Sequence, residues 1–349
     1  MAPTWTPDSM PDLKGKVVVP FSTFETNIII YLSYSKGLGI HTVKHLATHG
    51  AKVYCGARSK ERFDKAQQQL LEENPSFTRE RLIFLKLDLG NIDSVLDAVK
   101  EIKAKESSIH ILINGAGMVT GRAGNEGEWD EVMAVNHIGH FVLTNGLFPL
   151  LKAACAEKDS DVRVVSVASN TPGIFLPKNY EFGLTTSVCL QKVVPYYPWR
   201  WQYLYSQVFG MDMVRYSIAK AATILFIKGL QQRVDEDKLP ILCLSLNPGG
   251  VATDGAEDIM KPLFRPILRV GRLTPDQGSY HSLWAATARE PRQSFEKFKG
   301  KYLEPTGIIT TQHPVMDNEE QRQGIWDVTT AEVNRYLSSR GLGSLMEWK

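Results

Sequence analysis

The feature that most constrains this chain is the alternation of short apolar segments with longer amphipathic ones along most of its length. The short segments are rich in β-branched residues, which is typical of buried strands, and the longer ones repeat apolar residues every three or four positions, as helices do. Strands are predicted at 51–57, 81–89, 109–117, 162–169 and 240–250, and helices at 38–50, 60–74, 92–105, 131–154 and 213–234.

This order of segments predicts an α/β protein built on a doubly wound parallel sheet of the Rossmann type. Consecutive parallel strands need a crossover connection, and a helix supplies it while covering one face of the sheet. No linker rich in Pro, Ser or Gly divides the sequence, so a single domain is expected over residues 1–349. A C-terminal extension, 261–349, is expected to add a helix at 274–290, a last strand near 307–311 and a final helix.

Composition limits the classes of partner. Charged residues make up 22% of the chain and the net charge is +2, with no basic stripe, so we expect no nucleic-acid partner. The N-terminus lacks the apolar core of a secretion signal, and no run of 18 apolar residues predicts a membrane span. The four cysteines form no CxxC pair, which indicates reduced thiols and a cytoplasmic protein. A small-molecule substrate is expected, and a homo-oligomer remains open.

A glycine-containing turn precedes the first predicted helix. Lys36, Gly37, Leu38 and Gly39 lie where a strand should lead into a helix whose N-terminal N–H groups suit a pyrophosphate. Arg58 and Lys60 follow the second strand, at the place where an acidic side chain would bind a ribose 2′-hydroxyl and a cation accommodates a 2′-phosphate. Together with Lys36 they favour NADP (NADPH) as the cofactor; the alternative is a solvated basic loop.

Two positions on one helix and one at a strand end suit acid–base chemistry. Tyr216 and Lys220 are four residues apart and therefore lie on one helix face. A phenol has a pKa of about 10, and a nearby ammonium group lowers it toward the range that general acid–base catalysis needs. Ser169 ends a predicted strand, where its hydroxyl can hydrogen-bond a developing oxyanion. The alternatives are an exposed helix pair and a loop cap.

Seven short motifs occur in an order that resembles the short-chain dehydrogenase/reductase family. They are SKGLG, LDL, NGAG, AVNHIGHF, VASNT, YSIAK and NPGGVAT, between about residues 13 and 256. The surrounding sequence is most similar to the retinol-dehydrogenase-like branch. The resemblance implies an NAD(P)-dependent oxidoreductase that interconverts an alcohol with a ketone or aldehyde.

The resemblance also implies a role for each matching residue. Tyr216 would transfer a proton to or from the substrate oxygen, and Ser169 would orient the carbonyl. Lys220 would hold the nicotinamide ribose and lower the pKa of the phenol, with Asn136 holding a water in a proton relay behind it. The remaining expected cofactor contacts are Asp88 at the adenine, Asn114 near the adenosine-side ribose, and Val251 and Thr253 at the nicotinamide end. Gly115 and Ala116 are expected to be small enough for close approach to the cofactor.

The cofactor turn departs from the family pattern at Ser33, where the family has its first glycine. Residues 16–19 and 28–32 both read as the first strand, and fourteen residues, 20–33, replace a connection of about four. Either the strand forms from 27–32, or the segment is translated non-coding sequence from a misplaced splice junction, which the better match of its flanks favours. The alternative function is a catalytically impaired regulatory or scaffold protein of the Rossmann type.

A second departure is the aromatic-rich insert at about 172–211, since 47 residues (216 − 169) separate Ser169 from Tyr216. Its aromatic side chains suit a pocket for a bulky, flat, polyketide-like substrate of specialised metabolism. A membrane surface, a second subunit or a separately packed excursion remain alternatives. The side chains are Tyr196, Tyr197, Trp199, Trp201, Tyr203, Tyr205 and Phe209.

Histidines at two places suggest other chemistry, which we do not expect. His41, His45 and His49 recur every four residues but lack acidic or cysteine partners in the motif, so a solvated helix face is expected and no metal site. His137 and His140 flank Asn136, and the resemblance gives them no catalytic role.

Overall fold

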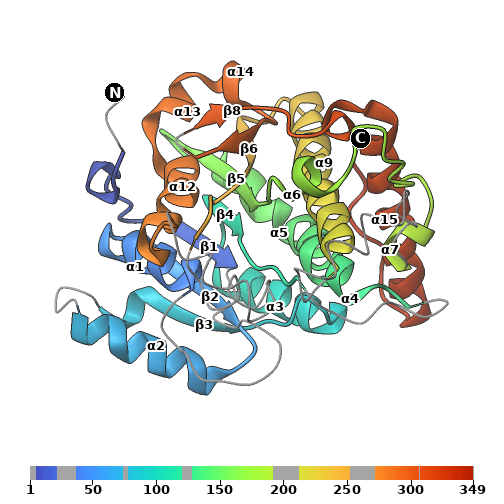
Figure 1. Cartoon of the computed structure of the whole chain (residues 1–349). Helices are drawn as coiled ribbons and strands as arrows, with labels where there is room; N and C mark the ends of the chain where they lie inside the picture. The colour runs from blue at the N-terminus through green and yellow to red at the C-terminus, as the bar shows by residue number, and fades with distance from the viewer. Residues whose placement is uncertain are drawn as a thin grey trace.

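The computed structural model describes residues 5–21, 37–73, 78–119, 128–191, 212–251, 272–305 and 307–348. Its centre is one eight-stranded sheet with helices on both faces (Figure 1). The strands are β1 (Val17–Phe21), β2 (Lys52–Ala57), β3 (Leu82–Lys86), β4 (Ile111–Asn114), β5 (Val162–Val167), β6 (Ile241–Leu246), β7 (Tyr302–Glu304) and β8 (Ile308–Ile309).

The strand order confirms the predicted doubly wound α/β fold. The order is β3-β2-β1-β4-β5-β6-β7-β8, and every neighbouring pair is parallel except β7 and β8, which are antiparallel. The chain winds outward from β1 in one direction and from β4 in the other. The carboxyl ends of these two adjacent strands therefore form the switch point at which such sheets bind ligands.

The first strand is Val17–Phe21. Val18 pairs with Val53 of β2 on one side and with Ile111 of β4 on the other, so this segment occupies the central position. The alternative that 27–32 forms the first strand is therefore wrong. Ser33 and Lys36 lie outside the described residues, and the splice-junction explanation stays a prediction.

Most helices begin and end close to the predicted positions. Asn91 caps the helix over 92–105 by accepting a hydrogen bond from the Ser94 N–H, and its buried residues follow the helical period. The helices are α1 (Leu38–Thr48), α2 (Lys60–Glu73), α3 (Ile92–Lys105), α4 (Glu131–Met133), α5 (Gly139–Ala154), α6 (Thr171–Phe175), α7 (Val188–Gln191), α9 (Met213–Glu236), α12 (Pro275–Thr287), α13 (Arg289–Gln293), α14 (Phe295–Phe298) and α15 (Glu319–Ser339), with a π-helical turn η3 (Ala134–Ile138) and the 3₁₀ turns η1 (Pro7–Ser9), η2 (Arg79–Arg81) and η5 (Pro314–Asp317).

The sheet separates two apolar clusters. Along β1, Val17 and Val19 belong to the cluster beneath α3, α5, α9 and α15, whereas Val18 belongs to the cluster beneath α1, α2 and α12. Side chains alternate between the faces of a strand, so a central strand must be apolar on both. This requirement explains why the strands read as continuous apolar runs.

The region after residue 272 is an integral part of this architecture. Its strand β7 extends the sheet beside β6, its helix α12 packs on α1, and its helix α15 packs on α9. The predicted helix, last strand and final helix are present, but β7 was not predicted, because three residues are too few to show a period. All four cysteines are free thiols, as expected.

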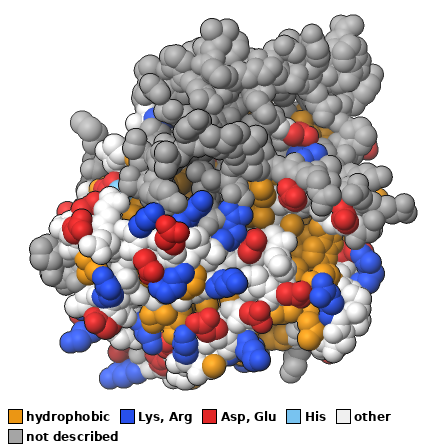
Figure 2. Space-filling view, turned by 90° about the horizontal axis from the view of Figure 1, so that it is seen from below, with side chains coloured by type: hydrophobic (Ala, Val, Ile, Leu, Met, Phe, Trp, Pro, Cys, Tyr) orange, Lys and Arg blue, Asp and Glu red, His pale blue; other side chains and the backbone are white. Residues whose placement is uncertain are grey.

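The expectation of a solvated histidine face on α1 is wrong. Asp276 of α12 accepts from His45 Nε2 at 2.9 Å and lies 3.3 Å from His41 Nδ1. The hydrogen bond of His45 therefore connects α1 to α12. Elsewhere, Figure 2 shows basic and acidic side chains interspersed over the described part of one face. Among the described residues, no helix is both long and apolar enough to cross a membrane.

Candidate active site

The predicted site residues gather at one edge of the sheet because each follows the carboxyl end of a parallel strand or lies on a helix that starts there. The described residues at this edge are Arg58 after β2, Asp88 after β3, Asn114 to Ala116 at and after β4, Ser169 after β5, Val251 after β6, and Gly37 to Gly39 at the start of α1. Lys36, Thr253 and the seven aromatic residues of the insert lie outside the described residues.

Tyr216 and Ser169 meet at this edge. Asp212 caps α9 by accepting hydrogen bonds from the N–H groups of Val214 and Arg215, at 3.1 and 3.0 Å, which places Tyr216 in the first turn. The Tyr216 phenol is hydrogen-bonded to the Ser169 hydroxyl. A carbonyl oxygen that reaches this point would find two hydroxyl groups together.

Burial controls the acidity of this phenol. It raises the pKa of Tyr216 to about 12, against the smaller lowering effect of the Ser169 hydrogen bond. The Lys220 nitrogen lies 5.6 Å from the centroid of the Tyr216 ring. In the protein chain alone the pKa of the phenol is therefore raised, because the cost of burying a phenolate is the largest effect, and a lowering of this pKa by Lys220 stays a prediction.

Lys220 lies one helical turn after Tyr216 and is 4% exposed. Its Nζ donates to the carbonyl oxygen of Val167, the last residue of β5, at 2.9 Å. Burial lowers the pKa of its ammonium group to about 8. A Cβ on Gly117 would lie 3.1 Å from this Nζ and 2.7 Å from Asn136 Oδ1, so both polar groups face the space beside Gly117.

Asn136 lies in the π-helical turn η3, an irregularity that is frequent at functional sites. Its Nδ2 donates to the carbonyl oxygens of Met118 and Val132 at 2.7 and 2.8 Å, and its Oδ1 accepts from the Met118 N–H at 3.3 Å. Its own carbonyl oxygen accepts from Thr223 Oγ1 at 3.0 Å. The side chain therefore fixes the loop after β4 through its hydrogen bonds to Met118. The expected role of Asn136 in a water relay stays a prediction.

Asn114 has a structural use that the sequence did not reveal. Its side chain is 1% exposed, and Nδ2 donates to Thr144 Oγ1 at 3.1 Å and to Ser166 Oγ at 3.3 Å. It therefore holds β4 against β5 and α5. The backbone of Gly115 and Ala116 would then make the expected contact near the cofactor ribose in place of the Asn114 side chain.

The described start of the cofactor turn fits a phosphate group. Gly37 is the N-cap of α1, with extended backbone, and no described side chain caps this helix. A Cβ on Gly278 of α12 would lie 2.6 Å from Leu38 Cδ2 and 2.5 Å from Val251 Cγ2. The glycine at 278 therefore leaves room for the side chains of Leu38 and Val251, a support that sequence reasoning missed.

Cations follow β2, where no acidic side chain takes their place. Arg58 is half-buried directly after the strand. Lys60 begins α2 and pairs with Asp64 at 2.7 Å, so part of its charge is already compensated. Asp88 accepts from the Gly90 N–H at 3.0 Å and thereby stabilises its own turn after β3. These residues fit a dinucleotide cofactor, together with the start of α1, which no described side chain caps, and the small side chains after β4.

Glu304 is a further supporting residue that the sequence did not reveal. Its carboxylate accepts from Asn247 Nδ2 at 2.8 Å and from the Tyr302 hydroxyl at 3.0 Å. Asn247 Oδ1 in turn accepts from the Gly249 N–H at 3.2 Å, in a turn where Gly249 has a φ of +88°. The turn before Val251 is therefore fixed from β7, by a residue 57 positions away (304 − 247).

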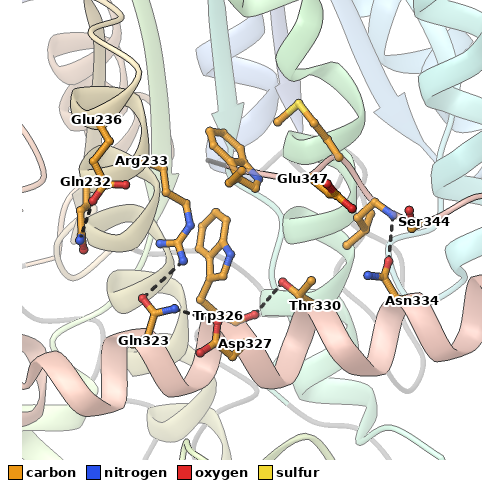
Figure 3. A pocket seen from close by; sticks show the side chains of 13 residues that line it. Gln232, Arg233, Glu236, Gln323, Trp326, Asp327, Thr330, Asn334, Ser344 and Glu347 are labelled. Atoms are coloured by element: carbon orange, nitrogen blue, oxygen red, sulfur yellow. Dashed lines mark hydrogen bonds between the residues drawn. The ribbon is translucent and has the colours of Figure 1, made fainter.

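A cavity of about 560 Å³ lies elsewhere, between α9, α15 and the C-terminal segment (Figure 3). The Arg233 guanidinium lies 3.8 Å from the centroid of the Trp326 ring in this cavity. None of the residues predicted for the active site lines it. The side chains predicted for acid–base chemistry therefore lie at the sheet edge and not in this cavity.

A doubly wound sheet with this site at its switch point defines the class of dinucleotide-binding α/β proteins. The family model described as short chain dehydrogenase matches residues 27–178. The short chain dehydrogenase/reductase dpchH of Colletotrichum higginsianum is 36% identical over 98% of this chain and 79% of that protein. The short chain dehydrogenase/reductase dpfgH of Gibberella zeae is 35% identical over 98% of this chain and 87% of that protein. The chain belongs to the short-chain dehydrogenase/reductase family; the retinol-dehydrogenase-like branch stays a prediction.

Solved structures share the fold. The NADPH-bound carbonyl reductase from chicken fatty liver has a TM-score of 0.57 at 18% identity, over 89% of this chain and all of that chain. The 3-ketoacyl-(acyl-carrier-protein) reductase from Brucella melitensis, complexed with NADH, has a TM-score of 0.56 at 21% identity, over 84% of this chain and 98% of that chain. At these identities the similarity extends to the fold alone.

Proposed function

We propose that this protein uses NADPH to reduce a ketone or aldehyde group on a bulky substrate. As a member of the short-chain dehydrogenase/reductase family, it is an oxidoreductase that interconverts CH–OH and C=O groups with NAD(P). The proposal adds the cofactor, the direction and the substrate class. The observation that carries it is the meeting of the Tyr216 and Ser169 hydroxyl groups beside the buried Lys220.

The cofactor and three side chains have separate roles in the proposed reaction. The nicotinamide ring supplies or accepts the hydride when the cofactor is bound. Ser169 donates a hydrogen bond to the substrate oxygen, and Tyr216 transfers the proton to it. At neutral pH the phenol carries its proton, so Tyr216 can donate it to the substrate oxygen in the reductive direction. Lys220 is expected to contact the nicotinamide ribose. From there its positive charge would favour the phenolate that forms when Tyr216 donates its proton.

The preference for NADPH rests on Arg58 and Lys60 after β2. A cation at this point compensates a 2′-phosphate, whereas NAD-binding members of such folds commonly use an acidic residue there. Arg58 is the stronger candidate because it directly follows the last residue of β2, whereas Lys60 begins α2 two residues later. We therefore assign the 2′-phosphate contact mainly to Arg58.

The bulky, polyketide-like substrate rests on the aromatic residues of the insert, which lie outside the described residues. Amphipathic aromatic side chains suit a large flat ligand with few polar groups. An NADPH-rich cytoplasm would favour the reductive direction. The gene's deletion should then lead to accumulation of a carbonyl compound, detectable by metabolite profiling.

Cofactor titration tests the proposal. The fluorescence of NADPH and of NADH is followed as each is added to the wild type and to Arg58→Ala, with Lys65→Ala as a matched control, since Lys65 pairs with Glu61 on α2. We expect the wild type to prefer NADPH and Arg58→Ala to lose about tenfold in NADPH affinity, with NADH affinity unchanged. Preference for NADH would contradict the cofactor assignment, and binding of neither would support the scaffold alternative.

A further inference from the structure

His140 is buried one helical turn after Asn136, at 2% exposure. Its Nε2 lies 2.9 Å from the carbonyl oxygen of Ala116. A carbonyl oxygen only accepts hydrogen bonds, so Nε2 must carry the proton. Burial lowers the pKa of His140 to about 4, so the ring is neutral at physiological pH. The imidazole is thus a fixed donor to the loop that follows β4.

This loop is held at two points by the same helical run. His140 holds the carbonyl of Ala116, and the Asn136 side chain binds both the N–H and the carbonyl of Met118. Gly117 lies between these points, and a Cβ there would be 3.1 Å from Lys220 Nζ. The position of the loop therefore sets the space beside Lys220.

His137 provides an internal comparison. It is 1% exposed and its Nε2 lies 2.9 Å from Thr329 Oγ1 of α15. That hydroxyl already donates to the Ile325 carbonyl, so His137 must be the donor to it. Burial lowers the pKa of His137 to about 3. His137 thus makes an equivalent buried hydrogen bond, but to a distant helix and not to the site.

We propose that His140 is a positioning residue of the active site, which holds the loop of residues 116–118 where Gly117 can face Lys220 and Asn136. The assignment rests on the proposed function, because it presumes that this loop and Lys220 border the bound cofactor. The ring itself transfers no proton, since its single N–H is committed to Ala116. A neutral ring also adds no second positive charge near Lys220.

Matched variants separate positioning from stability. His140→Leu and His137→Leu each remove one buried hydrogen bond, so both should lower the thermal unfolding midpoint by several degrees. Only His140→Leu should weaken NADPH binding, by about tenfold in fluorescence titration, and lower kcat. His140→Gln, whose amide nitrogen can reach the same carbonyl, should bind NADPH within about threefold of the wild type.

The outcomes distinguish this inference from the function on which it rests. Equal NADPH affinities for the wild type and His140→Leu, or equal weakening by His137→Leu, would overturn the inference alone. Failure of the wild type to bind either nicotinamide cofactor would overturn the proposed function as well. If His140→Leu does not fold, His140→Asn replaces it, because its amide is too short to reach Ala116; an NADPH affinity equal to that of His140→Gln would then overturn the inference.

Discussion

Burial acts in opposite directions on the two ionisable groups of the proposed acid–base pair. Desolvation disfavours the charged form of each group, so it raises the pKa of the Tyr216 phenol to about 12 and lowers that of the Lys220 ammonium to about 8. The protein chain alone therefore holds a protonated phenol at neutral pH.

The pKa of Lys220 predicts a pH-dependent contribution to stability. Its pKa is about 10.4 in the unfolded chain and about 8 in the folded one, so between these values the unfolded state binds more protons. Burial of the charge therefore destabilises the fold below pH 8, and this penalty disappears as the pH rises toward 10.4. The free energy of unfolding of the wild type, relative to Lys220→Met, should rise by about 2 kcal/mol between pH 7.5 and 10.

Denaturant unfolding of both proteins across this pH range measures the difference. Tyr216 is present in both, so its own titration largely cancels. A difference that stays constant or falls with pH would show that Lys220 is not buried as a charged group at neutral pH.

Gly117 predicts a kinetic effect, because a side chain at this position would displace groups of the proposed site. A Cβ at this position would lie 2.7 Å from Asn136 Oδ1, and the Asn136 side chain makes three hydrogen bonds that resist displacement. Gly117→Ala should therefore shift the loop or Lys220 and lower kcat about ten- to a hundredfold. The assay is NADPH oxidation with 2-acetylnaphthalene or another flat ketone that the wild type reduces. Gly343→Ala, where a Cβ meets nothing within 4 Å, is the control and should behave as the wild type.

At the scale of elements, the local sequence pattern predicted where helices lie, but it did not predict departures from α-helical geometry within them. The 92–105 helix matches its predicted bounds because its cap and apolar period are both local. The 131–154 helix was predicted as one element, yet it contains the π-helical turn around Asn136. The turn makes long-range contacts, such as the hydrogen bond from Thr223 to the Asn136 carbonyl, which the sequence alone does not display.

The C-terminal segment after α15 forms a contact that also could not be predicted. The Trp348 Nε1–H donates to Asn145 Oδ1 at 2.7 Å. The centroid of the Trp348 ring lies 4.3 Å from that of the Phe148 ring and 5.6 Å from that of the Trp326 ring. Asn145 is buried in α5, with its Nδ2 bonded to the Phe141 carbonyl. The last residues of the chain are therefore joined to the helix that begins next to the active-site turn.

Trp348→Ala should consequently lower the free energy of unfolding by about 2 kcal/mol, since it removes aromatic packing and leaves Asn145 Oδ1 buried without its donor. Trp348→Phe, which keeps a ring but no donor, should lose less. Chemical denaturation gives both values, and NADPH affinity should not change because the contact lies away from the sheet edge. An unaltered midpoint for Trp348→Ala would contradict the observed packing.

At the scale of the whole molecule, parallel topology explains why the site could be foreseen while its supports could not. Carboxyl ends of parallel strands meet at one edge, so Ser169, Asp88 and Val251 could be placed together from strand order alone. Glu304 and Gly278 act on the site from the last quarter of the chain, through β7 and α12, and carry no local signal. The raising of the Tyr216 pKa by burial was also not predicted, because only the packed structure reveals that burial.

The most direct test of the account is the turnover of Tyr216→Phe with NADPH and a carbonyl substrate that the wild type reduces. The variant keeps the buried ring and loses only the hydroxyl group hydrogen-bonded to Ser169. We predict that kcat falls by at least a thousandfold, while the dissociation constant for NADPH, measured by fluorescence in the same preparation, changes less than threefold. Turnover within tenfold of the wild type would show that another group donates the proton and would contradict the proposed mechanism.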